Sequence, residues 1–400
     1  MDNSPTFLTI PFELRLPIYE WFLTQHRQIR LNRQPSSQHL RFLRICKQIY
    51  DEASPLFYRY ISLRHERQIN AFILHADQSI CTQVTWADVA NDGRVILAKD
   101  ARKEADSASP LSNLHIALRR MPSLKRLRVF PCRQGLPFSL QRVPAGLALD
   151  FETAMYPSGS HHQLRGYELY LEPETKVTPF AVISPESIEL LRLTGDCHLP
   201  ASPHMPALCH LTLHAITGNH FDLHTVVQCF PGARLESFCY GHGDRLGFEF
   251  RNRHLESLIP LSCGQLRKLV LLGCSRLTST AIATCLDGLP QLDYFALSLI
   301  TVDELRTNFV LSLSPTISVV KLHIINAWYA IPLIAEERGL CDALETTILN
   351  RKIPPRQIWV NFRDRLMIEE DRRSRWREIA YCRQFMLAVG PWNTGDQEDL

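Results

Sequence analysis

The stretch Leu266-Arg-Lys-Leu269-Val-Leu271-Leu-Gly-Cys274-Ser-Arg-Leu277-Thr278 contains the pattern that decides the fold. In this pattern the first, fourth and sixth residues are apolar, here Leu266, Leu269 and Leu271, and the residues between them can be of other types. Because alternate residues of a strand face the same side, this order predicts a short strand with one apolar face. The residues that follow, Ser279 to Leu286, are typical of a helix. A single strand and helix cannot exclude water alone, so we expect several such units to stack on one continuous core.

The same pattern occurs eight times along the chain. The copies are Leu124-Leu127-Val129, Leu164-Tyr167-Leu169, Ile188-Leu191-Leu193, Leu208-Leu211-Leu213, Leu235-Phe238-Tyr240, Leu266-Leu269-Leu271, Leu292-Phe295-Leu297 and Ile317-Val320-Leu322. The first step is 40 residues long and contains Pro137, Pro144 and Gly146, so we expect an inserted loop there. The other copies start 20 to 31 residues apart, in or near the period of leucine-rich repeats.

The fullest copy, with Cys274 after its strand, resembles the cysteine-containing class of leucine-rich repeat. This resemblance implies an α/β solenoid, in which a curved parallel β-sheet is lined by outer helices. The alternative is an ordinary α/β domain whose strands share the same apolar pattern. Eight copies in series favour the solenoid.

Composition excludes several classes of protein. A chain of 400 residues is long for one core, which favours two domains or an elongated repeat array. With 45% hydrophobic and 21% charged residues the chain is globular rather than disordered. A net charge of +3 is too small to indicate a nucleic-acid or membrane partner. We therefore expect neither.

The cysteines and the N-terminal sequence indicate an intracellular protein. Twelve cysteines without tight regular pairs are typical of reduced thiols rather than of a disulfide framework. The start, Met-Asp-Asn-Ser-Pro, lacks the basic and apolar regions of a signal peptide, and no apolar run reaches the length of roughly 18 residues that a membrane span needs. We expect a cytoplasmic or nuclear location, or both.

An apolar segment precedes the repeats. In this segment apolar residues recur every three or four positions, which places them on one face of a helix. They are Leu8, Pro11, Leu14, Ile18 and Phe22. A second apolar segment follows at Leu40, Leu43, Ile45, Ile49 and Leu56. The two segments together predict a small helical unit that is too short to bury its own apolar side. We therefore expect the remaining apolar surface to bind a partner.

Two stretches of this unit carry a specific resemblance. Ile10-Pro11-Phe-Glu13-Leu14-Arg15-Leu16-x-Ile18-Tyr19-Glu20 and Leu43-Arg-Ile45-Cys46-Lys47-Gln48-Ile49-Tyr50-Asp51-Glu52-Ala53-x-Pro55-Leu56-Phe57-Tyr58 resemble the F-box of fungal F-box proteins. The resemblance covers about residues 7 to 60. An F-box followed by leucine-rich repeats is similar to the substrate receptors of SCF-type cullin-RING ubiquitin ligases, which direct protein degradation. In that family the F-box docks on the Skp adaptor, and through it on a cullin, while the repeats hold the target protein.

The resemblance implies a non-catalytic receptor subunit without cofactors, because the ubiquitin chemistry belongs to partner subunits. The implied adaptor-binding residues are Leu8, Pro11, Leu14, Ile18, Leu43, Ile45 and Ile49. Two features depart from the family pattern. Pro17 lacks a backbone donor, so we expect the helix to begin again there, and the polar stretch from Thr24 to His39 lengthens the link between the helices. The alternatives are that these apolar residues pack on the first repeat, or that the chain is an interaction scaffold outside any ligase.

The sequence predicts four segments. Residues 1–60 form the F-box-like domain, 61–113 a linker and degenerate first repeat, 114–362 the solenoid, and 363–400 a capping helix with an acidic tail. Within the second segment, we expect a strand at Ile61–Leu63, a helix after it, and an exposed connection at Lys99–Asp106. Within the fourth, one amphipathic closing helix is expected to contain Leu366, Trp376, Ile379, Phe385 and Leu387.

The repeat pattern also predicts a basic recognition surface. Positions three and five of each copy lie on the side of the sheet opposite the leucines. These positions are rich in Arg and Lys, with Glu168 as the one acidic residue among them, and His214 and His323 extend the surface. The predicted substrate-binding residues are Arg126, Arg128, Tyr170, Arg192, His210, Lys268, Tyr294 and Lys321. Guanidinium groups bind carboxylates and phosphates with paired hydrogen bonds, so we expect an acidic or phosphorylated protein target.

Other chemistries are weakly supported. Histidines and cysteines gather between Cys197 and His254, but Cys239-x-x-His242 alone does not supply the four ligands of a structural zinc site. The run from Gly241 to Gly247 has one residue too many for a dinucleotide fingerprint. A nucleophile elbow and a phosphate-binding loop are both missing from the sequence. We expect no metal and no enzymatic activity.

Overall fold

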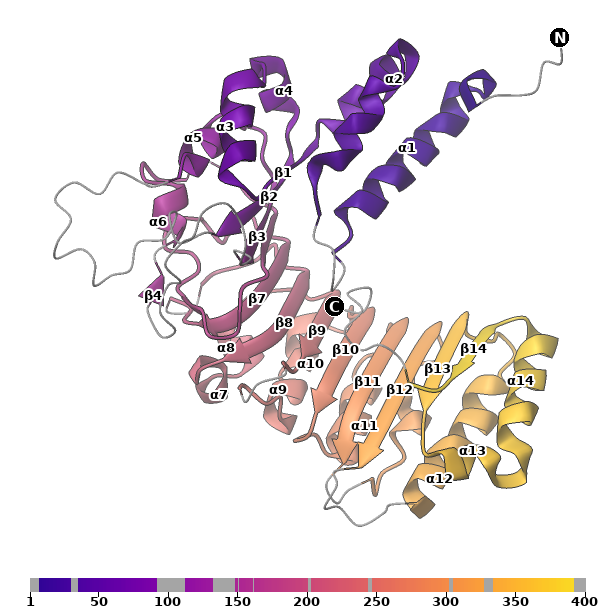
Figure 1. Cartoon of the computed structure of the whole chain (residues 1–400). Coiled ribbons are helices and arrows are strands. Elements are labelled where there is room, and N and C mark those ends of the chain that lie inside the picture. Colours follow the sequence, from indigo (N-terminus) through magenta and orange to yellow (C-terminus); the bar gives the residue numbers. More distant parts are fainter. Residues whose placement is uncertain are drawn as a thin grey trace, which may run out of the picture. The chain divides into compact units, whose positions relative to one another are not determined.

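The computed structural model describes residues 7–29, 35–91, 112–131, 148–149, 151–160, 162–200, 203–243, 247–301, 305–326 and 334–391. The chain divides into two compact units, Met1–Ile188 (unit 1) and Glu189–Leu400 (unit 2). Both units are α/β, with parallel strands and helices (Figure 1). The predicted connection at Lys99–Asp106, the prolines and glycine expected in the inserted loop, and the acidic tail from Trp392 lie outside the described residues.

Unit 1 begins with helices and continues into a sheet. Its elements are η1 (Phe7–Thr9), α1 (Phe12–Arg27), η2 (Ser37–Arg44), α2 (Lys47–Phe57), β1 (Tyr60–Leu63), α3 (Glu66–His75), α4 (Gln78–Gln83), β2 (Trp86–Asn91), α5 (Leu114–Arg119), β3 (Arg126–Pro131), β4 (Ala148–Leu149), α6 (Phe151–Met155), β5 (Gly166–Leu169) and β6 (Lys176–Val177). The expected strand at Ile61–Leu63 and the helix after it are confirmed as β1 and α3.

The main sheet of unit 1 has the parallel order β1-β2-β3-β5. Its register sorts the side chains into two faces, because alternate residues point to opposite sides. The apolar face carries Ile61, Ala87, Leu127, Tyr167, Leu63, Val89, Val129 and Leu169. The other face carries Tyr60, Trp86, Arg126, Gly166, Ser62, Asp88, Arg128 and Glu168. This second face is therefore polar and aromatic.

The helices at the start of unit 1 supply most of a small core. We call α1, η2 and α2, together with η1, the helical element. The buried apolar residues of this core are Tyr19, Leu23, Leu43, Ile49, Ala53 and Phe57 of the helical element and Tyr60 of β1, and Trp86 of β2 packs against them. Aromatic rings fill much of this core: the ring of Phe22 lies 5.0 Å from that of Phe42 and 6.0 Å from that of Phe57. Aromatic pairs bury a large area per residue, which suits a core built from few residues.

Helix α1 is continuous, so the expected restart at Pro17 is wrong. The helix runs from Phe12 to Arg27 with Pro17 inside it. A proline inside a helix lacks the N–H that would bond the carbonyl four residues earlier, here that of Glu13. Both Pro17 and Glu13 are exposed, so water can bond this carbonyl instead. Exposure therefore lowers the cost of the proline.

Unit 2 alternates strands with helices. Its elements are β7 (Leu190–Cys197), β8 (His210–Thr217), α7 (His220–Leu223), α8 (Val226–Cys229), β9 (Ser237–Gly241), α9 (Asn252–Glu256), α10 (Leu258–Ser262), β10 (Lys268–Cys274), α11 (Ser279–Asp287), β11 (Tyr294–Thr301), η4 (Phe309–Ser312), β12 (Val319–Asn326), α12 (Ile334–Ala343), η5 (Leu344–Leu349), β13 (Gln357–Asn361), α13 (Asp364–Ile368), η6 (Glu369–Asp371), α14 (Arg372–Arg383) and β14 (Met386–Val389). The helix expected from Ser279 is confirmed as α11.

The strands of unit 2 form one parallel ladder in chain order, from β7 to β14, which we call the ladder (Figure 1). The apolar residues of the predicted pattern stand in register across it: Leu191, Leu211, Phe238, Leu269, Phe295 and Val320. The three pattern residues of all eight copies, in both units, are at most 2% exposed. Each copy therefore marks a strand with its apolar face inside, as predicted, and the arrangement is solenoid-like.

One prediction about the elements needs correction, and one strand was missed. The single closing helix is interrupted, because Glu370 and Asp371 adopt left-handed φ angles of 52° and 51°. Helix α14 ends at Arg383, and the next residue, Gln384, has a left-handed φ angle of 58°. Phe385 then leads into strand β14, which adds to the ladder next to β13. Strand β2 was not predicted at all. The division between the compact units, at Ile188, also differs from the four segments read from the sequence, which stay a prediction.

Two further observations bear on function. Within the described residues, none of the helices has both the length and the apolar character that a membrane crossing requires. Every cysteine that the structure describes is a free thiol.

Candidate functional site

An apolar stripe lies exposed on helix α1. Leu14, Ile18 and Trp21 follow the spacing i, i+4, i+7, which places them on one side of the helix. Their exposed fractions are 59%, 43% and 64%. Ile45, between η2 and α2, is 63% exposed. We call these four exposed residues of the helical region, three on α1 and one before α2, the exposed stripe. Groups of exposed large apolar side chains are uncommon on soluble proteins and mark interaction surfaces.

The opposite side of α1 holds the helical element together. Arg15, Tyr19 and Leu23 are buried there at spacing i, i+4, i+8. Arg15 Nε donates to Glu52 Oε2 of α2 at 2.9 Å, and the Tyr19 hydroxyl donates to the same oxygen at 2.8 Å. Arg15 Nη1 also donates to the carbonyl of Leu8 at 3.0 Å. These bonds tie η1, α1 and α2 to one another, so the exposed stripe rests on a fixed support.

Electrostatics reinforce this support. The hydrogen bonds from Arg15 lower the pKa of Glu52 to about 2. Burial, followed by the hydrogen bond to Glu52, raises the pKa of Tyr19 to about 12. Glu52 is therefore ionised and Tyr19 neutral at neutral pH, which is the pairing that the observed hydrogen bonds require.

The predicted adaptor-binding residues separate into two groups. Leu8, Pro11, Leu14, Ile18 and Ile45 are exposed. Leu43 and Ile49 are instead buried in the core of the helical element, at 6% and 4% exposure. These two residues support the surface and are not on it, because their position on α2 and η2 turns them toward the aromatic core. Sequence reasoning also missed Trp21, which stands seven residues after Leu14.

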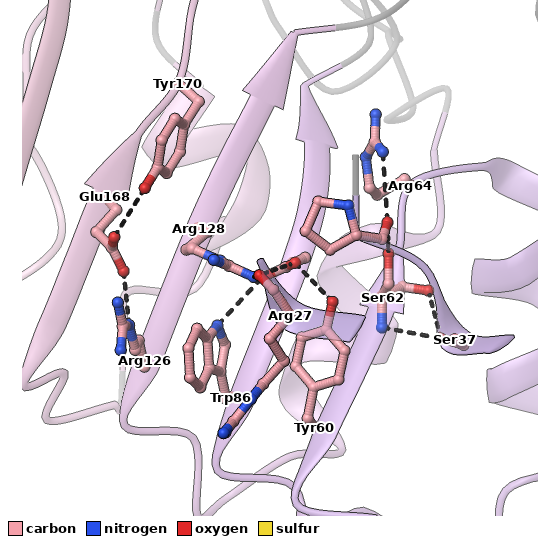
Figure 2. A network of polar contacts seen from close by, with 12 residues as sticks. Arg27, Ser37, Tyr60, Ser62, Arg64, Trp86, Arg126, Arg128, Glu168 and Tyr170 are labelled. Atoms are coloured by element: carbon pink, nitrogen blue, oxygen red, sulfur yellow. Dashed lines mark hydrogen bonds and ion pairs between the residues drawn. The ribbon is translucent and has the colours of Figure 1, made fainter. Parts of the chain in front are cut away.

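A second candidate site is the polar face of the unit 1 sheet, shown in Figure 2. Its centre is Asp88 on β2, which is fully buried. Asp88 accepts two hydrogen bonds of 2.7 Å from Arg128, one of 2.7 Å from the Tyr60 hydroxyl and one of 3.1 Å from Trp86 Nε1. Four donors occupy the lone pairs of this carboxylate. Burial opposes the charge of Arg128, but Asp88 outweighs it and raises the pKa of Arg128.

Arg126 and Glu168 form a second ion pair on this face (Figure 2). Arg126 Nε lies 2.6 Å from Glu168 Oε1, and the Tyr170 hydroxyl donates to Glu168 Oε2 at 3.1 Å. The ring of Tyr170 is stacked on that of Phe130, 5.0 Å away. A Cβ at Gly166 would lie 2.8 Å from Arg126 Cγ, so glycine leaves the space in which the Arg126 side chain crosses β5.

These pairs change the predicted basic surface. Glu168 was the one acidic residue expected on this surface. Asp88 was not expected there, because β2 was not predicted. Arg128, at 4% exposure, is buried against Asp88 and is a structural ion pair rather than an open contact for a target. Of the three residues predicted on this part of the surface, Arg126 and Tyr170 remain half-buried at the surface.

The other predicted recognition residues lie on the ladder of unit 2. His210 is exposed, and Lys268 and Tyr294 are half-buried. Arg192 and Lys321 are buried, at 3% and 8% exposure. The amine of Lys268 lies 5.2 Å from the ring of Tyr294, and that of Lys321 lies 5.5 Å from the same ring. The structure thus brings the two lysines to one aromatic ring, an arrangement that stabilises cations.

The histidines predicted to extend this surface do not add charge to it. Burial, with the charge of Arg192 as a second cause, lowers the pKa of His214 to about 3. Burial also lowers the pKa of His323. Both imidazoles are therefore neutral at neutral pH. The described residues contain no cluster of three or more His, Cys, Asp or Glu side chains arranged to hold a metal ion.

Most of the polar-face residues that sequence reasoning missed belong to β1 and β2. Val84, Ala87 and Val89 are buried at 1%, 0% and 0% exposure and repeat the pattern of the predicted copies with smaller side chains. This signal could have identified β2 and placed Asp88 next to Arg128.

Comparisons with known proteins add no assignment: no protein-family model matches the chain, and no curated protein matches it.

Proposed function

We propose that this chain is a non-catalytic receptor that brings two proteins together: the substrate-recognition subunit of an SCF-type cullin-RING E3 ubiquitin ligase. In this proposal the helical element acts as an F-box and binds the Skp adaptor, and through it a cullin. The strand and helix units act as leucine-rich repeats that hold the target protein. The observation that carries the proposal is the exposed stripe on the helical element.

The exposures support docking rather than folding as the role of the stripe. A side chain that stabilises the fold is removed from water, whereas Leu14, Ile18, Trp21 and Ile45 keep 43% to 64% of their surface exposed. The residues that stabilise the helical element are different ones, namely Tyr19, Leu23 and the pair Arg15–Glu52. Docking residues and folding residues are therefore separate on α1.

Co-expression with the Skp adaptor tests the proposal. We expect the wild-type chain to co-purify with the adaptor and the double variant Leu14→Asp, Ile18→Asp to lose it. Each well-buried anchor at an interface contributes about 2 kcal/mol or more, so each single change should weaken binding by at least about 30-fold. The matched controls are Leu223→Asp and Ile353→Asp, which place the same charge on residues of unit 2 that are 67% and 83% exposed.

The outcome separates the receptor from the scaffold. If both controls bind the adaptor and the double variant does not, the stripe is the docking surface. A wild-type chain that does not co-purify with the adaptor contradicts the receptor and leaves the interaction scaffold. The target itself is expected to be acidic or phosphorylated, as the sequence predicts.

A further inference from the structure

One row of side chains crosses the whole ladder on the face that carries the predicted recognition residues, and we call it the central row. Pairing between neighbouring strands aligns its members. From β7 to β14 they are Arg192, Thr212, Cys239, Val270, Ala296, Lys321, Trp359 and Ala388. The middle of the row is small and mostly apolar, whereas cations and an indole stand toward its ends.

The charge on this face of the ladder has one sign. The row that precedes the central row on the same face contains Leu190, His210, Ser237, Lys268, Tyr294, Val319, Gln357 and Met386. Together the two rows carry Lys268, Lys321 and Arg192, and neither row contains an aspartate or a glutamate. A segment with several carboxylates that lies across these rows is therefore attracted to all three cations.

Aromatic rings stand beside the two lysines. The amine of Lys321 lies 5.5 Å from the ring of Tyr294 and 6.0 Å from that of Trp359, and the amine of Lys268 lies 5.2 Å from the ring of Tyr294. Both rings also pack against the buried middle of the central row, where Val270 and Ala296 are 0% exposed. Cations next to aromatic and apolar surface suit a peptide that has both acidic and apolar side chains.

The chain leaves β14 beside this row. Trp359 Nε1 donates to the carbonyl of Gly390 at 3.1 Å, and the Gly390 N–H donates to the carbonyl of Val360 at 2.9 Å. Gly390 has a φ of 137°, a conformation that residues with a side chain rarely adopt, so glycine permits the turn that the chain makes here. The described chain therefore ends, at Pro391, next to the Trp359 end of the central row.

The sequence that follows has the complementary composition. Residues 392–400, Trp-Asn-Thr-Gly-Asp-Gln-Glu-Asp-Leu, lie outside the described residues and contain three carboxylates, an aromatic and an aliphatic side chain, and no lysine or arginine. Nine extended residues span at most about 30 Å. Neighbouring strands lie about 4.8 Å apart, so Lys321 on β12 and Lys268 on β10 are only about 5 and 14 Å from β13 across the sheet. Asp396, Glu398 and Asp399 are therefore within reach of both lysines.

We propose that residues 392–400 bind across the central row of their own chain, with their carboxylates beside Lys321 and Lys268. The segment then occupies the recognition surface that the proposed function assigns to the ladder, and it competes there with an acidic target. The competition rests on the proposed function. The binding of the segment itself rests on the ladder alone and does not depend on docking to the adaptor.

Hydrogen exchange of the purified full chain, read by mass spectrometry over residues 392–400, tests the binding. Each rate is compared with that of a free peptide of the same sequence. We expect at least tenfold protection in the wild type, and loss of this protection in the triple variant Asp396→Asn, Glu398→Gln, Asp399→Asn and in the double variant Lys268→Gln, Lys321→Gln. Lys352→Gln, a change of an exposed lysine of unit 2 outside the two rows, is the matched control and should keep the protection.

A labelled peptide of residues 390–400 added to the full chain measures the competition. It should bind the triple variant at least tenfold more tightly than the wild type, in which the surface is already occupied. Exchange in wild-type residues 392–400 as fast as in the free peptide, or equal protection in the wild type and the triple variant, overturns the proposal. Protection that is lost on dilution assigns the segment to a second copy and also overturns binding within one chain.

The design keeps the two proposals separate. The triple variant changes only residues outside the ladder, so its result holds even if the lysine variant does not fold. Adaptor co-purification is expected to be intact in every one of these variants, because none of them alters the exposed stripe. A wild-type chain that does not bind the adaptor contradicts the receptor but leaves the protection of residues 392–400 unchanged.

Discussion

The helical element and the ladder treat their apolar residues in opposite ways. In the ladder, pattern residues such as Leu211 and Phe295 are at most 1% exposed. In the helical element, Leu14 and Trp21 are 59% and 64% exposed. This difference shows that an apolar pattern in the sequence indicates which side chains are suited to burial, but it does not indicate which surface buries them.

The reason lies in the number of neighbours that each element has. Each inner strand of the ladder has a strand on both sides, so its apolar face continues into the next copy. Helix α1 instead packs through one side, where Arg15, Tyr19 and Leu23 meet α2 and η2. Its other apolar side has no such repeat to join within the helical element.

The largest expected effect compares the same substitution in both regions. Leu211→Asp would bury a charge in the ladder and should lower the free energy of unfolding by at least about 5 kcal/mol, or prevent folding. Leu14→Asp should change it by less than about 0.5 kcal/mol, because residue 14 remains in water. Denaturant unfolding followed by circular dichroism measures both. A similar loss of unfolding free energy in the two variants would contradict the difference between the ladder and the helical element.

The next effect concerns the buried ion pair of unit 1. Asp88→Ala leaves Arg128 buried without its carboxylate, so we expect a loss of about 3 to 5 kcal/mol in unfolding free energy. Glu168→Ala is the matched change, and its loss should be smaller, since its partner Arg126 is 32% exposed and can bind water. Thermal and denaturant unfolding provide the readout. A larger loss for Glu168→Ala would contradict the assignment of Asp88 as the centre of the network.

A pH effect should distinguish the core of the helical element. His39 is fully buried, and its Nε2 lies 3.3 and 3.2 Å from the carbonyls of Phe57 and Tyr60. Burial lowers its pKa from 6.5 to about 4. As the pH falls, His39 is therefore protonated in the unfolded chain at a higher pH than in the folded chain. The folded state loses stability from pH 6.5 down to about pH 4. The total loss is about 3 kcal/mol.

His39→Gln should remove this part of the pH dependence. Unfolding free energies of the variant and the wild type are compared at several values between pH 4.5 and 7, above the range in which Glu52 titrates. Burial also lowers the pKa of His254 in unit 2, so the informative quantity is the difference between the two proteins. Equal slopes would show that His39 is not buried as a neutral imidazole.

The smallest effect concerns one hydroxyl. Tyr19→Phe removes the 2.8 Å hydrogen bond to Glu52 but keeps the ring, so the unfolding free energy should fall by about 1 kcal/mol. Tyr381→Phe is the control, because Tyr381 is 87% exposed. Adaptor binding should be unchanged in both variants, since neither residue belongs to the exposed stripe. A Tyr19→Phe protein as stable as the control would contradict the role of this bond.

The repeating part of the fold was predictable from the sequence because the signal is local. A strand with a neighbour on each side needs apolar residues at fixed spacing, and all eight predicted copies are buried strands. Strand β2 escaped because Ala87 stands where the other copies have a large apolar residue. The prediction of a single closing helix was wrong for another local reason, because Glu370 and Asp371 adopt left-handed φ angles.

The candidate sites were less predictable because they depend on residues far apart in the chain. Exposure of Leu14 and Ile18 agrees with their expected place on a surface, but burial of Leu43 and Ile49 follows from the aromatic core formed by Phe22, Phe42 and Phe57. The pairing of Arg128 with Asp88 spans 40 residues and follows from the register of β2 against β3. Arg27, 101 residues from Arg128, could not be placed from its own surroundings in the sequence.

The most direct test of the account is hydrogen exchange of the full chain with and without the Skp adaptor, read by mass spectrometry. The account predicts slower exchange in residues 11–25 and 43–57 on binding, and unchanged exchange in the ladder strands β8 to β12. Exchange that is unchanged in α1, or slowed in the ladder instead, would contradict the claim that the exposed stripe is a docking surface.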